Sequence, residues 1–142
     1  MEQHMKTEGE KADFFMKNKV TLVTGAAWGI GLTTARAFAQ AGAIAVLSDI
    51  NEPAQQAEEL VKQGFKAMSI QCDVSDERQV KTMIGKIVVS CGRLDAAYNN
   101  AGINSPVAET ADTSSEGYDR VMNINLRGIW NCMKYELRQM RQ

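Results

Sequence analysis

Short apolar runs alternate along this chain with longer segments in which apolar residues recur at helical spacing. The runs predict four buried strands, at residues 19–24, 43–48, 66–71 and 94–99. Between them, apolar side chains repeat every three or four positions, as expected of helices that pack one face on a core. Because strand and helix alternate, the pattern predicts an α/β fold with a doubly wound parallel sheet and helices on both faces.

The expected helix boundaries follow from capping residues and from gaps in the periodicity. The second helix is predicted to have Asn51 as its cap, and the third is predicted to open at Ser75. A single long helix is predicted from Ser115 to the end of the sequence. Residues 1–17 lack periodicity and are predicted to be a flexible tail, which leaves one domain at 18–142.

Composition and charge exclude several classes of protein. The 142 residues carry 16 basic and 17 acidic side chains, so the sequence has no electrostatic signature of a nucleic-acid-binding surface. No apolar run approaches the roughly 20 residues of a membrane span. The three cysteines are far apart and odd in number, which predicts neither a disulfide framework nor a metal site. We therefore expect a cytoplasmic protein that binds no nucleic acid, membrane or metal.

Three glycines crowd the expected turn between the first strand and the first helix, in the sequence TGAAWGIG. A glycine allows a sharp turn, and its missing Cβ lets the backbone approach a pyrophosphate. The N–H groups that open the next helix would then face the anion. This motif makes candidate cofactor-binding residues of Thr24, Gly25, Gly29, Ile30 and Gly31. The alternative interpretation is a tight turn with close packing of helix on strand.

The next three strands end in residues that suit the same kind of site. Asp49, followed by Ile50, ends the second strand eighteen positions after the last of these glycines, where a dinucleotide site needs an acid for the adenosine ribose. Asp73, followed by Val74, ends the third strand. Either aspartate could instead be an ordinary turn residue ahead of a helix. The fourth strand ends in NNAG (99–102), which by itself indicates only a turn.

Asn125 is an unusual residue for its position in the last helix. At helical spacing it falls among apolar residues, between Val121 and Ile129. A buried amide without partners costs roughly 1–3 kcal/mol, so this side chain is expected to form hydrogen bonds. Asn125 is either a structural residue that bridges backbone groups or a functional one, and the residues alone weigh the two interpretations evenly.

Taken in order, these motifs resemble those of the short-chain dehydrogenase/reductase family over about residues 18–142. TGAAWGIG is similar to its glycine motif, CDV to its adenine-contacting segment and NNAG to its fourth-strand motif. NINLRG resembles the segment that carries its catalytic Asn, which falls on Asn125. The resemblance implies a Rossmann-type sheet of order 3-2-1-4 that is incomplete relative to the family. It also implies a nicotinamide cofactor, held by Thr24, Gly25, Gly29, Ile30, Gly31, Asp49, Ile50, Asp73, Val74, Asn100, Ala101 and Gly102.

The family's active site is only partly present in these residues. The family uses an Asn, a Ser and a Tyr with a Lys four positions later, but Tyr98, Tyr118 and Tyr135 all lack that Lys. The resemblance therefore implies the N-terminal, cofactor-binding half of an oxidoreductase. Its reaction would transfer hydride between NAD and an alcohol or carbonyl substrate, such as a cyclic alcohol or diol. The 142-residue chain alone is expected to be inactive, with Asn125 in a supporting role. The alternative is a catalytically inactive nucleotide-binding fragment or pseudogene product.

Two further expectations concern specificity and assembly. Asp49 should repel the extra phosphate of NADP, and no Lys or Arg at 26–30 or 50 offsets that repulsion, so NAD is expected to be preferred. The resemblance implies that complete members form homo-oligomers. A sheet of order 3-2-1-4 leaves the fourth strand at an edge, where Leu94, Ala96 and Ala97 are expected to meet water.

Overall fold

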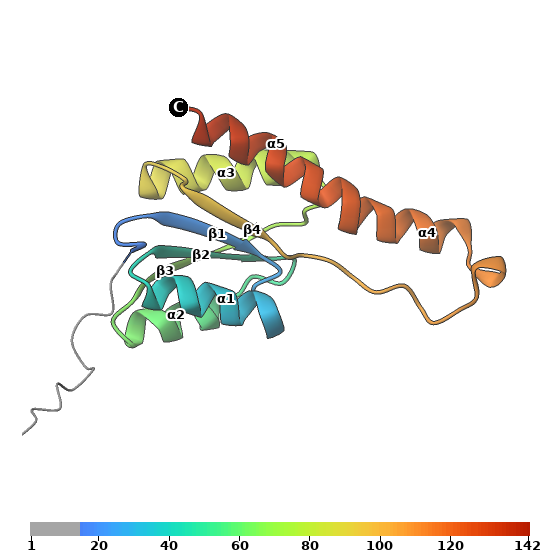
Figure 1. Ribbon diagram of the computed structural model, residues 1–142, viewed down its shortest axis with the longest axis horizontal. Coiled ribbons are helices and arrows are strands. Elements are labelled where there is room, and N and C mark those ends of the chain that lie inside the picture. Colours follow the sequence, from blue (N-terminus) through green and yellow to red (C-terminus); the bar gives the residue numbers. More distant parts are fainter. Residues whose placement is uncertain (1–14) are drawn as a thin grey trace, which may run out of the picture.

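The computed structural model describes residues 15–142 and places them in a four-stranded parallel sheet with helices on both faces (Figure 1). The strands are β1 (Val20–Thr24), β2 (Ile44–Asp49), β3 (Lys66–Gln71) and β4 (Ala96–Asn99). Their order is β3-β2-β1-β4, and every neighbouring pair is parallel. The predicted fold class and strand order are therefore confirmed. Of the predicted tail, residues 1–14 lie outside the described residues.

Two layers of helices enclose the sheet (Figure 1). Helices α1 (Gly29–Gln40) and α2 (Ala54–Lys62) cover one face, while α3 (Glu77–Cys91) and α5 (Gly128–Met140) cover the other. Because side chains alternate along a strand, β1 serves both layers. Leu22 packs into the core under α3, and Val23 packs into the core under α1 and α2. All five residues of β1 are buried, as its continuous apolar pattern indicated.

Several predicted boundaries are wrong by a few residues, for local reasons. Helix α2 begins after Pro53, so Asn51 does not cap it. Helix α3 begins at Glu77 rather than Ser75, because the Asp76 carboxylate accepts hydrogen bonds from the first N–H groups of that helix. Strand β4 begins at Ala96 rather than Leu94. Leu94 is only 4% exposed, so the expectation that it would meet water is wrong.

The predicted single C-terminal helix is interrupted. Helix α4 (Ser115–Met122) leads into a π-helical turn (Asn123–Arg127), and α5 follows. A π-turn widens the helix by one residue and shifts the side chains that follow around the axis. A short 3₁₀ helix (Thr110–Asp112) precedes α4, which projects past the sheet while α5 lies beside α3 (Figure 1).

Both outer strands of the four-stranded sheet have a free edge. β3 pairs only with β2 and β4 only with β1 among the described strands, which confirms that β4 is an edge strand. Tyr98 of β4 is 39% exposed, and Ala96 and Ala97 are half-buried. No helix in the part of the chain that the structure describes is both long and apolar enough to cross a membrane.

Candidate functional site

The carboxyl end of β1 turns sharply into α1 through the predicted glycine motif. Gly25 and Gly29 have φ angles of 65° and 60°, in the left-handed region that favours glycine. Gly31 is glycine for a different reason, since a Cβ there would lie 2.0 Å from the carbonyl oxygen of Gly25. Close packing of helix on strand is thus part of the explanation, in agreement with the alternative interpretation of the motif.

The same turn leaves room for a ligand. At Gly29, an added Cβ would meet no atom of residues 15–142 within 4 Å, apart from its chain neighbours and its own helix backbone, so the space beside it is open. Trp28, at the N-cap of α1, makes no side-chain cap hydrogen bond, and the first turn contains no acidic residue. The opening N–H groups of α1 therefore have no side-chain acceptor, and they suit a phosphate group.

Asn100 fixes the turn from the end of β4. Its Nδ2 donates to the carbonyl oxygens of Thr24 and Gly25, at 3.2 and 3.1 Å. The Thr24 hydroxyl oxygen accepts from the backbone N–H groups of Asn100 and Ala101, each at 3.1 Å. Hydrogen bonds thus join two motifs 76 positions apart in the sequence at the carboxyl edge of the sheet.

Asp49 also contacts the glycine turn. Its Oδ2 accepts from the backbone N–H of Ala27 at 3.1 Å, and its Oδ1 accepts from the N–H of Asn51 at 3.3 Å. Gln56 of α2 donates from Nε2 to the carbonyl oxygen of Ala27 at 2.9 Å. The carboxylate is half-buried and lies beside the turn, while Ile50 after it is 57% exposed.

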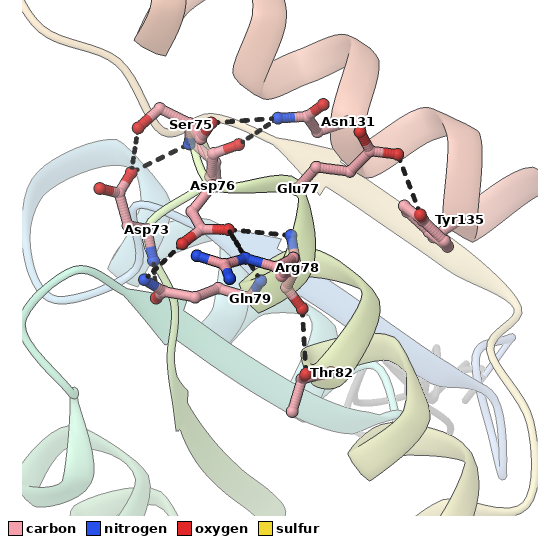
Figure 2. A network of polar contacts seen from close by, with 10 residues as sticks. Asp73, Ser75, Asp76, Glu77, Arg78, Gln79, Thr82, Asn131 and Tyr135 are labelled. Carbon is pink, nitrogen blue, oxygen red and sulfur yellow. Dashed lines mark hydrogen bonds and ion pairs between the residues drawn. The ribbon is translucent and has the colours of Figure 1, made fainter.

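Asp73 and Val74 follow the end of β3 at Gln71, and Asp73 belongs to a separate polar network (Figure 2). The Asp73 Oδ1 accepts from the N–H and the hydroxyl of Ser75, at 2.9 and 2.7 Å. This is the turn role that the alternative interpretation gave Asp73. Val74 is buried against Gly128 of α5, where an added Cβ would lie 2.6 Å from its Cγ2. The Asp73 carboxylate forms no hydrogen bond to the glycine turn.

Asn125 lies in the π-turn and bridges backbone groups of one residue. Its Oδ1 accepts from the N–H of Ile103 and its Nδ2 donates to the carbonyl oxygen of Ile103, both at 2.8 Å. A Cβ on Gly102 would lie 3.2 Å from the Asn125 Oδ1. The side chain is half-buried and its amide is satisfied, so the structural interpretation accounts for its contacts. Its supporting role in catalysis stays a prediction.

Two buried polar residues of α5 were missed by the sequence reasoning. Asn131, which Figure 2 shows beside Ser75, is 1% exposed, and its Nδ2 donates to the carbonyl oxygen of Val74 at 2.9 Å. Glu136 is 3% exposed, and its Oε2 accepts from the Nδ2 of Asn99 at 2.9 Å. Glu136 lies four positions after Cys132 and Asn131 lies four positions before Tyr135, and both of these partners pack in the core, so helical spacing is the signal that could have found them.

Apolar positions on the same helix behave differently from expectation. Trp130, Met133 and Leu137, which fit a core stripe by spacing, are 53%, 46% and 44% exposed. The apolar side chains of α5 therefore divide between the protein core and solvent. Lys134 lies over the Trp130 ring, with its Nζ 4.9 Å from the ring centroid, and donates to Glu77 at 2.6 Å.

Other parts of the described surface carry less chemistry. Open hollows lie along β3 and its neighbouring helices, lined by residues such as Ser69, Thr82 and Lys86, away from the glycine turn. Among residues 15–142, no three His, Cys, Asp or Glu side chains gather where they could hold a metal ion. We therefore assign the candidate site to the carboxyl edge of the sheet, because donors, an acid and open space converge there.

Comparison with known proteins agrees with this arrangement. The family model described as Enoyl-(Acyl carrier protein) reductase matches residues 25–142. Cyclohexanol dehydrogenase from Acinetobacter sp. (strain SE19) is 40% identical over 122 residues, which are 84% of this chain and 49% of that protein. The 2,5-dichloro-2,5-cyclohexadiene-1,4-diol dehydrogenase of Sphingobium indicum (strain DSM 16412 / CCM 7286 / MTCC 6364 / B90A) is 34% identical over 122 residues, which are 86% of this chain and 48% of that protein.

A solved structure gives the same result. The crystal structure of a short chain dehydrogenase from Mycobacterium smegmatis superposes with a TM-score of 0.85 at 36% identity, covering 90% of this chain and 54% of that one. The chain belongs to the short-chain dehydrogenase/reductase family, a family of oxidoreductases that use nicotinamide cofactors. It spans about half the length of the curated relatives it matches.

Proposed function

We propose that this chain forms the cofactor-binding part of an NAD-dependent alcohol dehydrogenase or carbonyl reductase. The observation that carries the proposal is the position of Asp49, whose carboxylate bonds to the backbone of the glycine turn at Ala27. A carboxylate beside a turn whose helix-opening N–H groups lack a side-chain acceptor suits a ribose with two free hydroxyls next to a phosphate. The nicotinamide would accept or supply the hydride, and the residues of this edge of the sheet would bind and orient it.

The same carboxylate supports a preference for NAD over NADP. Charge-assisted hydrogen bonds from ribose hydroxyls to Asp49 are worth roughly 1.5–3 kcal/mol. A phosphate in place of one hydroxyl would put two negative groups together. The nearby side chains of Trp28, Ile30 and Ile50 are exposed at 79%, 70% and 57% and carry no charge to compensate.

Titration of both cofactors tests this proposal. We expect tighter binding of NAD than of NADP. Asp49→Ala should narrow the difference in affinity, because it removes hydrogen bonds to the NAD ribose and removes the charge repulsion of the NADP phosphate. The matched control is Asp119→Ala, which removes an exposed aspartate on α4 and should change neither affinity. Tighter binding of NADP by the unmodified chain would contradict the assignment.

We further propose that these 142 residues do not turn over substrate by themselves. The Tyr135 hydroxyl donates to Glu77 at 2.9 Å, and neither it nor Tyr98 or Tyr118 has a Lys four positions later to lower a phenol pKa. No alcohol-dependent NADH formation above background is expected. Adding the C-terminal half of a close relative should restore turnover, and Asn125→Ala in that chimera should lower it. Turnover by the bare chain at an ordinary enzyme rate would contradict the proposal.

The substrate is proposed from the relatives alone. Two proteins of similar sequence are named for a cyclohexanol and a cyclohexadiene diol, so a cyclic alcohol or diol is the proposed class. Comparing NAD reduction by the completed chimera with cyclohexanol and with a linear alcohol of equal carbon number tests it. The alternative function is a catalytically inactive nucleotide-binding fragment. It is favoured if the completed chimera binds NAD but does not reduce it with any of the alcohols.

A cytoplasmic homo-oligomer is the proposed working form of the complete enzyme. The apolar side chains exposed on the π-turn and α5 support assembly, because Leu126, Trp130, Met133 and Leu137 are each 44–60% exposed. Sedimentation of Leu137→Lys against the unmodified chain tests it, with a shift toward monomer expected. Lys81→Glu, an exposed change on α3, is the control for altered charge.

A further inference from the structure

Two buried acceptors remain without partners on side chains that are already bonded to each other. Asn99 ends β4 and donates from Nδ2 to the Glu136 Oε2 at 2.9 Å. The second oxygen of each group, the Asn99 Oδ1 and the Glu136 Oε1, is buried and has no hydrogen-bond partner. An unsatisfied buried polar atom costs about 1–3 kcal/mol, so two on one bonded pair call for a physical explanation.

A proton on Glu136 satisfies both atoms at once. A carboxylic acid and an amide are planar groups of matching shape, and each can offer a donor and an acceptor to the other. When the amide N–H donates to one carboxyl oxygen, an O–H on the other can donate back to the amide oxygen. We infer that Glu136 is held as the neutral acid and that its proton closes a cyclic hydrogen-bonded pair with Asn99.

The surroundings of Glu136 favour the neutral form. Burial raises its pKa above the ordinary value, and the Asn99 hydrogen bond lowers it only in part. None of the ion pairs within residues 15–142 includes Glu136. An ionised Glu136 would therefore be a buried carboxylate without a counter-charge, and burying an unpaired charge costs a large amount of free energy.

The other ionisable groups near this pair carry no compensating charge. On α5, Cys132 lies one turn before Glu136, and burial raises its pKa, as it raises that of Cys72 to about 12. Among the charged groups of the neighbouring α3 and of the residues before β4, Glu77 is paired with Lys134, Arg78 with Asp76, and Asp95 with Arg93. The other two charges of α3, Lys81 and Lys86, are exposed to solvent. Tyr98 is the remaining titratable group on β4 itself.

The pair fixes a functionally placed strand end. Asn99 is followed directly by Asn100, which holds the carbonyl oxygens of Thr24 and Gly25. β4 is an edge strand, so its end is held by β1 on one side and by the bond to Glu136 of α5. Glu136 is thus a positioning residue for the glycine turn, and its proton makes that role sensitive to pH.

Direct observation of the Glu136 carboxyl group tests the inference. In the ¹³C-labelled chain, the side-chain carboxyl resonance that disappears in Glu136→Gln should titrate above the ordinary value of 4.5. A glutamine has the shape of the neutral acid and donates from Nε2 where the acid donates from its O–H. Titration of this resonance at or below 4.5 would overturn the inference.

Unfolding measurements provide a second, independent readout. Because the pKa of Glu136 is raised in the folded state, the stabilisation from its neutral form is complete below pH 4.5 and is lost as pH rises through the folded-state pKa. Each unit of elevation corresponds to about a tenfold change in the unfolding constant. Glu136→Gln should abolish this pH-dependent loss of folding stability. Glu136→Leu leaves the Asn99 amide without a hydrogen-bond partner and should destabilise the chain at every pH. Glu58→Gln, an exposed change on α2, is the control. Equal destabilisation by Gln and Leu at acidic pH would overturn the inference.

Discussion

The N-termini of α1 and α3 both follow a parallel strand at the same edge of the sheet, but their donors meet different partners. At α3, the Asp76 Oδ1 accepts from the N–H groups of Arg78 and Gln79, and the Gln79 Oε1 accepts from the N–H of Asp73 (Figure 2). At α1, Trp28 offers no acceptor and Gly29 opens on empty space. One helix start is satisfied by its own side chains, and the other leaves its first donors without a side-chain acceptor, an arrangement that suits an external anion.

The two regions share several features, since both contain a turn and a nearby aspartate and both follow a strand of the sheet. They differ in two respects. The turn into α1 contains Gly25 and Gly29, whereas residues 72–79 contain no glycine, and only at α3 does a side chain of the protein itself accept from the first N–H groups. Four substitutions test this contrast, beginning with the one that should disturb the molecule most.

Gly31→Ala should have the largest effect. Its Cβ would lie 2.0 Å from the carbonyl oxygen of Gly25, so the backbone of the turn must move. We expect a loss of about 1–3 kcal/mol in the free energy of unfolding, as for an overpacked core, and a loss of NAD binding. Gly85→Ala on α3 is the control, because a Cβ there meets nothing within 4 Å. Urea unfolding and NAD titration of both variants measure the difference, and equal behaviour would contradict the packing argument.

Asp76→Ala should destabilise without altering cofactor binding. The carboxylate caps α3, and losing such a cap costs about 0.5–2 kcal/mol. NAD affinity should stay unchanged, since within residues 15–142 the Asp76 carboxylate bonds only to Arg78 and Gln79 and not to the glycine turn. Asp76→Asn keeps an acceptor oxygen at the cap and should recover most of the lost stability in thermal unfolding. A fall in NAD affinity for Asp76→Ala would show that the two helix starts are coupled.

Trp28→Asp should convert α1 to the α3 pattern. The backbone at residue 28 is extended, with φ −160° and ψ 176°, which suits a capping aspartate. Stability should rise by about 0.5–1 kcal/mol from the cap. Affinity for NAD should fall, because the carboxylate competes for the donors that the pyrophosphate needs. Trp28→Asn provides a capping side chain without a negative charge. We expect the same gain in stability in thermal unfolding, with a smaller loss of NAD affinity in titration.

The pH dependence of the α3–α5 contact should give the smallest effect. Hydrogen bonds from Lys134 and then Tyr135 lower the pKa of Glu77 from its ordinary value of 4.5. A lowered folded-state pKa contributes stability above pH 4.5 that disappears as pH falls through the folded-state value. Glu77→Gln should flatten that part of the unfolding profile, whereas Glu58→Gln should leave it intact. The effect is small because Glu77 is partly exposed to solvent.

Much of the fold and part of the site could be predicted from local sequence. The continuous apolar run of β1 indicated a strand buried on both faces, and the periodicity of Val80, Met83, Ile84 and Ile87 indicated the buried face of α3. Gly25 and Gly29 were placed in the turn because their sharp conformations depend on the chain immediately around them. The strand order came from the family resemblance, since periodicity does not specify which strands are neighbours.

Other features depend on residues that are far apart in the sequence. Local pattern could not show that Asn100 holds Gly25, that Asn125 bridges Ile103, or that α5 exposes Trp130 while burying Glu136. It also predicted one C-terminal helix, where a π-turn rotates the later residues relative to the earlier ones. The amino-acid sequence was enough to specify the strands, most helices and the glycine turn, because short-range sterics and burial periodicity control them. Which polar groups meet and which apolar ones stay exposed was settled only in the folded chain, because those outcomes depend on how distant elements pack together.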